Sequence, residues 1–228
     1  MEDKVSILPH PLFNEITNLR DGAVRSLFAV FDGHGGVVCA EYCRQHVHEN
    51  FVAAKEFGTD PCAALRNALS NTDKEFCAAC RRIHLLTSSG TTAIAAYLEG
   101  NLLVVANVGG WTWLLFHDFS DSRGVLCRAG KACAVSEDHK PSRKDERERI
   151  EALGGRVAAT EEEAFSKKSP SFLASCCSCL GSCWAPQRPL RVFPGGLSVS
   201  RTIGDISMKS SALIISDPDM FAVRRLAC

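Results

Sequence analysis

A short apolar run that ends abruptly in a glycine-rich turn constrains the fold of this chain more than any other feature. The run covers residues 27–31 (LFAVF), and the sequence DGHGG at residues 32–36 follows it directly. A run of this length is typical of a buried strand, and the glycines predict a tight turn at its end. Because a carboxylate at the end of a buried strand is held rigidly, Asp32 is a candidate ligand for a hard cation.

The turn supplies two further groups with possible chemistry. Gly33 lets the backbone turn tightly, so its carbonyl oxygen is a second candidate ligand. His34, beside such a cation, is placed to donate a proton to a leaving group. Taken alone, these residues are equally compatible with an ordinary glycine-rich turn that carries a surface histidine.

Two amphipathic helices are predicted after the turn. Apolar residues recur at helical spacing in two groups: Ala40, Cys43, Val47 and Phe51, then Leu65, Leu69, Thr72, Phe76 and Ile83. The turn-rich residues 58–61 (GTDP) separate the groups. This pattern predicts an antiparallel helix pair.

Two β-hairpins are predicted further along the chain. Residues 91–98 and 102–108 flank one turn, and residues 124–128 and 131–136 flank another. A helix is expected next, because Ser142-x-x-Asp145 has the pattern of a capping box. Its charged face, residues 143–151, is expected to be solvated and to hold i,i+4 ion pairs.

Composition and charge argue against several functions. The chain has 228 residues, with 26 Lys and Arg balanced by 26 Asp and Glu, so no basic field attracts nucleic acid. No apolar run is long enough to span a membrane. The charged start, Met-Glu-Asp-Lys, argues against a secretory signal, so an intracellular place in the cytoplasm or nucleus is expected. The twelve cysteines are then expected to be reduced and mostly buried.

Two stretches have the character of insertions. Residues 110–120 (GWTWLLFHDFS) are strongly apolar, and residues 158–194 are rich in Cys and Ser and are expected to form a long mobile loop. The second stretch contains Cys176, Cys177, Cys179 and Cys183. Their spacing is not a paired C-x₂-C, so zinc binding or lipidation stands beside an incidental surface cluster.

Five separated motifs occur in the order in which one enzyme family carries them. After the DGHGG turn come residues 89–93 (SGTTA), 105–109 (VANVG), 137–141 (EDHKP) and 196–205 (GLSVSRTIGD). From its start to about residue 220 the chain resembles the PP2C, or PPM, family of metal-dependent protein serine/threonine phosphatases.

The resemblance implies an α+β fold in a single domain over residues 1–228. That fold is a four-layer α-β-β-α sandwich of two antiparallel sheets flanked by helix pairs. The implied activity is hydrolysis of phosphoserine and phosphothreonine in phosphoprotein substrates. The implied cofactors are two Mg²⁺ or Mn²⁺ ions that share an attacking water, with a third, weaker ion. A monomer is expected.

The resemblance also implies roles for the residues of the turn. Asp32 matches the family's metal-bridging carboxylate, and Gly33 matches the residue whose carbonyl binds one ion. His34 matches the proposed general acid, so Asp32 and His34 are the expected catalytic pair. Glu2 and Asp3 match an acidic pair that binds metal directly or through water.

Three departures from the family pattern are visible. Asp121 matches an aspartate of the third ion, but the 110–120 insertion separates it from its motif and is expected to displace it. The family has a first strand and a phosphate-binding arginine just before the Met-Glu-Asp motif, and two more metal-binding aspartates after the motifs named above. This sequence contains none of these features. The fold is therefore expected to be incomplete at the C-terminus. The alternative to an enzyme is a catalytically inactive phosphatase-like protein or fragment that acts by binding partners.

Overall fold

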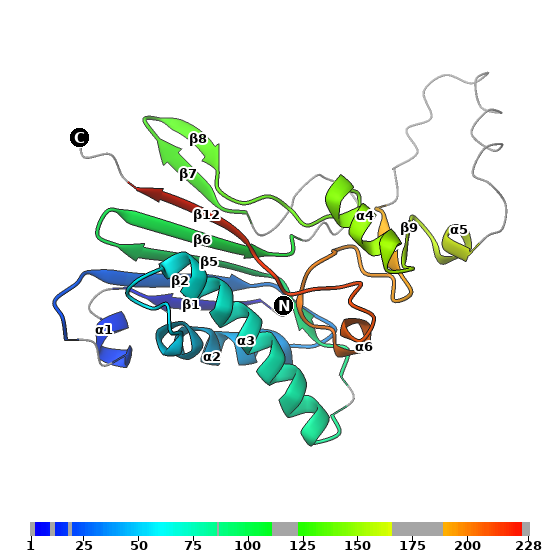
Figure 1. The fold of residues 1–228 in the computed structure, drawn as a ribbon, viewed down its shortest axis with the longest axis horizontal. Coiled ribbons are helices and arrows are strands. Elements are labelled where there is room, and N and C mark those ends of the chain that lie inside the picture. The colour runs from blue at the N-terminus through cyan, green and yellow to red at the C-terminus, as the bar shows by residue number, and fades with distance from the viewer. Residues whose placement is uncertain are drawn as a thin grey trace.

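The computed structural model describes residues 3–9, 12–17, 20–85, 87–110, 123–165 and 189–224. Its centre is a five-stranded antiparallel sheet in the order β1-β2-β5-β6-β12 (Figure 1). The strands are β1 Lys4–Leu8, β2 Arg25–Phe31, β5 Ala93–Glu99, β6 Leu102–Val108 and β12 Asp219–Arg224. Mixed α+β architecture with antiparallel sheets is thus confirmed.

Alternation of side chains gives this sheet two different faces. In β2, Leu27, Ala29 and Phe31 are buried, whereas Val30 on the other face is partly exposed. The register continues this division across the sheet, because Val30 lies opposite Ile94 of β5. In β2 and β5 the buried face is therefore the face that carries the helices.

Two long helices cover the buried face, as the sequence predicts (Figure 1). They are α2, Val38–Ala53, and α3, Pro61–Arg82. Asp60 starts α3, because its carboxylate accepts the backbone N–H of Ala63 at 3.0 Å. The prediction was wrong for Ile83, which follows the last helical residue and is 65% exposed.

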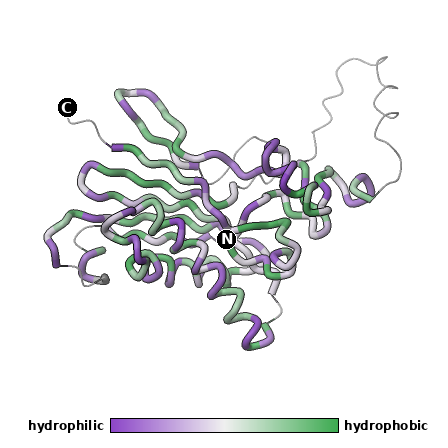
Figure 2. The backbone as a smooth tube through the Cα atoms, in the orientation of Figure 1, coloured by the Kyte–Doolittle hydropathy of each residue, from purple (hydrophilic) through white to green (hydrophobic). Residues whose placement is uncertain are grey.

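Aromatic rings fill the space between helices and sheet. The short helix α1, Leu12–Thr17, carries the fully buried Phe13. The rings of Phe51 and Tyr97 meet edge to face at 4.7 Å, and Phe13 packs against both. Figure 2 shows hydrophobic residues concentrated along the strands of the sheet. This core fixes the position of β2 and of the turn that follows it.

A hairpin on the opposite face adds a further layer. It consists of β7, Val125–Arg128, and β8, Lys131–Ala134, and it confirms the second predicted hairpin. At its base, a Cβ placed on Gly124 would overlap Val135 and lie 3.2 Å from Ile94. Ile94 belongs to the face away from the helices, so the hairpin base packs on that face.

The first predicted hairpin is formed by β5 and β6, with one difference in its bounds. It begins at Ala93 because Thr91 belongs to a separate three-stranded sheet. That sheet contains β3 Gly33–His34, β4 Gly90–Thr91 and β11 Ile203–Gly204 in the order β11-β4-β3.

The remaining elements lie at one end of the large sheet (Figure 1). They are α4 Lys144–Ala152, β9 Arg156–Ala158, α5 Glu161–Phe165, β10 Arg191–Phe193 and α6 Ile206–Lys209. At its two ends, the 158–194 stretch therefore differs from the expected loop, since it holds α5 and β10. Residues 166–188 and most of the 110–120 stretch lie outside the described residues.

The start of α4 corrects two expectations. The N-cap is Arg143, and no side chain caps the helix, so the predicted Ser142 capping box is wrong. The Asp145 carboxylate instead accepts two hydrogen bonds from the Arg143 guanidinium at 2.8 Å. The charged face is not fully solvated either, because Glu146 is only 1% exposed.

The cysteines among the described residues are free thiols, as predicted. Cys39, Cys43, Cys77 and Cys80 are buried, Cys62 is half-buried, and Cys127 and Cys133 are exposed. The cluster at residues 176–183 lies outside the described part of the chain. Within that part, no helix is long and apolar enough to cross a membrane.

Candidate active site

Two predicted site residues lie at the same end of the neighbouring strands β1 and β2. Asp32 directly follows β2, and Asp3 directly precedes the antiparallel strand β1. Because Lys4 is paired with Phe31, continuing this register by one pair places Asp3 beside Asp32. The Asp32 carbonyl also accepts the N–H of Thr92 at 3.0 Å, which fixes the turn to the start of β5.

His34 is held by a residue that sequence reasoning did not assign to the site. Its Nε2 lies 2.8 Å from Oδ2 of Asp205, and both side chains are buried. The same carboxylate oxygen accepts the hydroxyl of Thr202 at 2.6 Å. The three-stranded sheet brings these residues together, since β3 carries His34 and β11 directly precedes Asp205.

Gly90, between these two strands, is required by the close approach of His34 and Asp205. A Cβ on Gly90 would overlap the Asp205 carboxylate and lie 2.5 Å from Nε2 of His34. Any larger side chain would therefore separate the two partners. The glycine of the SGTTA motif thus has a packing role that its sequence alone did not reveal.

The donor atoms of the candidate metal ligands are of the type that a hard divalent ion prefers. Asp3 and Asp32 offer carboxylate oxygens and Gly33 a carbonyl oxygen, the donors that Mg²⁺ and Mn²⁺ prefer. In the described part of the chain, however, no group of three or more His, Cys, Asp or Glu side chains could hold a metal. Glu2 and Asp121 lie outside the described residues. The described residues thus supply part of a ligand set.

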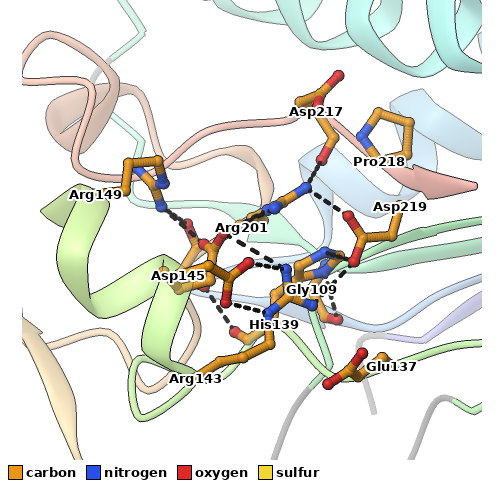
Figure 3. Close-up of polar contacts among 12 residues, drawn as sticks. Gly109, Glu137, His139, Arg143, Asp145, Arg149, Arg201, Asp217, Pro218 and Asp219 are labelled. Atoms are coloured by element: carbon orange, nitrogen blue, oxygen red, sulfur yellow. Dashed lines mark hydrogen bonds and ion pairs between the residues drawn. The ribbon is translucent and has the colours of Figure 1, made fainter.

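A buried ion-pair network lies beside α4 and was also missed (Figure 3). Glu146 accepts hydrogen bonds from Arg201 at 2.7 Å and 3.0 Å and from Arg149 at 2.9 Å. Arg201 continues to Asp219, at 3.0 Å, and so ties α4 to the first residue of β12. Burial alone would raise the pKa of Glu146, but the two arginines outweigh it and hold this pKa at about 2.

His139, of the EDHKP motif, completes the network (Figure 3). It is fully buried, the Gly109 N–H lies 3.0 Å from its Nδ1, and its Nε2 lies 3.1 Å from Asp219. Burial and the charge of Arg201 lower the pKa of His139, whereas Asp219 opposes that shift. We therefore describe His139 as a neutral imidazole that packs the start of β12.

A cavity of about 690 Å³ opens beside this network. It is lined by Glu137, Arg143, Lys144, Asp145, Glu148, Arg201 and Asp219. The lining mixes both signs of charge, and its arginines are already paired with carboxylates. Neither Asp32 nor His34 lines it, so the cavity is separate from the candidate active site.

Acidification is expected to destabilise the fold in two steps. Burial lowers the pKa of both His48 and His139, so below about pH 6.5 the unfolded chain binds protons that the folded chain does not. Below about pH 4.5 the depressed pKa of Glu146 adds a second loss, because unfolding then also takes up a proton. Urea midpoints measured from pH 7 to pH 3 should fall throughout. A midpoint that stays constant from pH 7 to pH 5 would contradict the lowered pKa values of His48 and His139.

Comparison with known proteins identifies the family. Residues 2–227 match the sequence profile of the protein phosphatase 2C family. Protein phosphatase 1F of Rattus norvegicus is 39% identical over 209 residues, which cover 92% of this chain and 37% of that protein. The chain belongs to the protein phosphatase 2C family, whose members in general depend on Mg²⁺ or Mn²⁺. It spans less than two fifths of the length of this relative.

Solved structures show the same fold. A sex-determining protein of C. elegans superposes with a TM-score of 0.71 at 21% identity, covering 99% of this chain and 45% of that one. A serine-threonine phosphatase 2C from Toxoplasma gondii gives a TM-score of 0.69 at 19% identity, covering 99% and 69%. The PP2C-like fold expected from the motifs is therefore confirmed.

Proposed function

We propose that this chain hydrolyses phosphoserine and phosphothreonine in proteins in a reaction that depends on Mg²⁺ or Mn²⁺. The observation that carries the proposal is the end of strands β1 and β2, where the register places Asp3 beside Asp32, two residues before the buried His34. These are the residues that the motif match assigns to metal binding and proton donation. The family membership of residues 2–227 supports the same activity.

The residues that the motif match assigns to the reaction would divide the work in the following way. Asp3, Asp32 and the Gly33 carbonyl would hold two divalent ions, with Glu2 as a further ligand and Asp121 at a third, weaker ion. When bound, such ions neutralise the phosphoryl oxygens and lower the pKa of the attacking water. His34 would hold a proton for the serine or threonine oxygen, which is a poor leaving group unless it is protonated.

We also propose that the protein is an intracellular monomer acting on phosphoproteins. The exposed, unpaired thiols of Cys127 and Cys133 support a reducing compartment, because exposed thiols persist where thiols are kept reduced. The balanced net charge gives no support for nucleic acid as a partner.

Release of phosphate from a phosphothreonine peptide tests the proposal. The purified chain should turn the peptide over with Mn²⁺ and lose this activity in excess EDTA, and fresh Mn²⁺ should restore it. Circular dichroism at each step shows whether the chain remains folded. No turnover from a folded chain supplied with Mn²⁺ would contradict the proposal and favour a protein that only binds partners.

A further inference from the structure

We propose that Asp205 is the positioning residue for His34, with its carboxylate fixing the orientation of the imidazole ring. The inference rests on the proposed function for its consequence in catalysis, but the contact itself is a feature of the fold. Asp205 is the last residue of the 196–205 motif and is not one of the candidate metal ligands. The proposal gives this residue a role.

The contact between the two side chains is short and shielded from water. Nε2 of His34 lies 2.8 Å from Oδ2 of Asp205, and the exposed fractions are 6% and 4%. The Thr202 hydroxyl binds the same oxygen at 2.6 Å, so the carboxylate has a fixed rotamer of its own. A buried hydrogen bond to a fixed partner restricts ring rotation far more than a solvated one.

The backbone around Asp205 is arranged for this contact. Asp205 has a φ of +47°, in the left-handed region that most side chains avoid. Its N–H donates to the Ser89 carbonyl at 3.2 Å, and its carbonyl accepts the N–H of Met208 at 2.8 Å at the start of α6. A strained conformation of this kind persists where the surroundings determine it, and it occurs frequently at functional sites.

A neighbouring buried pair holds the same segment from the other side. Asp73 of α3 accepts the N–H of Gly204 at 2.8 Å and the ammonium of Lys209 at 3.1 Å. Lys209 in turn binds the carbonyl of Thr202 at 2.6 Å. The segment that carries Asp205 is thus tied to a core helix, while Gly90 leaves room for the carboxylate to reach His34.

Two variants of Asp205 separate positioning from folding. Asp205→Gly removes the carboxylate and suits the positive φ, because glycine adopts left-handed backbone freely. Asp205→Asn keeps the shape and an acceptor oxygen, and asparagine also tolerates this backbone region. Asp217→Asn is the matched control, because the side chain of that exposed aspartate pairs with the exposed Arg66 and, among the described residues, with no other charged group.

Substrates with different leaving groups reveal the role of the ring. With Mn²⁺, Asp205→Gly should lower kcat on a phosphothreonine peptide about 100-fold, within the usual range for loss of general acid catalysis. Hydrolysis of p-nitrophenyl phosphate should change little, because p-nitrophenolate leaves without a proton. Asp205→Asn should retain more activity on the peptide than Asp205→Gly does. An equal loss on both substrates would overturn the proposal and assign Asp205 a structural role.

Nitrogen-15 NMR of the histidine side chains tests the contact without any turnover. In the unmodified chain the His34 Nε2 proton should be shifted downfield by its carboxylate partner, with His34→Gln used for assignment. Asp205→Gly should remove that shift and Asp217→Asn should not. If the shift survives in Asp205→Gly, positioning by Asp205 is wrong. Suppose that the unmodified chain shows the shift, that Asp205→Gly loses it, and that the unmodified chain does not hydrolyse the peptide. The positioning of His34 by Asp205 then holds and the proposed activity fails.

Discussion

Replacement of Asp32 by asparagine is expected to lower kcat/KM on a phosphothreonine peptide by about 10³-fold or more, equivalent to ~4 kcal/mol of transition-state stabilisation. Asparagine keeps the size of the side chain but removes the charge that a divalent ion requires. Asp32 follows the buried Phe31 and is anchored through its carbonyl to Thr92, so the fold should survive the change.

Thermal unfolding with and without Mn²⁺ provides a second readout for Asp32→Asn. Mn²⁺ should raise the Tm of the unmodified chain, because an ion that binds only the folded state stabilises it. The same addition should leave the Tm of Asp32→Asn nearly unchanged. Asp217→Asn, at an exposed aspartate that pairs with Arg66, should behave like the unmodified chain in both assays. Full activity of Asp32→Asn would exclude Asp32 as the main metal ligand.

The elements that the sequence predicts are those with a local periodic signal. The apolar run before Asp32 and the helical spacing of α2 and α3 lie within single segments, so each could be recognised by itself. The edge strands β1 and β12 were missed because their pairing depends on distant partners. The two-residue strands β3, β4 and β11 are too short to show any period.

The residues of the candidate site also divide into those with a local sequence signal and those without one. Asp32 and His34 lie in one turn, and their chemistry could be inferred from that turn together with the family motifs. Asp205 is 171 residues from His34, and only the three-stranded sheet shows that the two side chains meet. The position of Glu146 on a charged helix suggested solvent exposure, because nothing local shows that Arg201, 55 residues away, would cover it.

Replacement of Glu146 by glutamine is expected to lower the free energy of unfolding by about 3–5 kcal/mol, the usual cost of removing one partner from a buried ion pair. The expected loss of stability comes from Arg201, which stays in place after the substitution. Arg201 is 8% exposed, and without the Glu146 carboxylate its charge would stay buried with less compensation. Chemical unfolding in urea at pH 7 measures the change. Below about pH 4.5 the difference between the two chains should narrow, because unfolding then lets the Glu146 carboxylate take up a proton.

Glu148→Gln is the matched control, because Glu148 lies on the same helix, is exposed, and is 3.9 Å from Lys144. Its effect should stay below about 1 kcal/mol, as for other exposed pairs. A double-mutant cycle of Glu146→Gln with Arg201→Met should show a coupling of more than about 1 kcal/mol, since residues joined by direct hydrogen bonds are not additive. Additive losses, or equal losses for Glu146→Gln and Glu148→Gln, would show that α4 is held to β12 by packing rather than by this network.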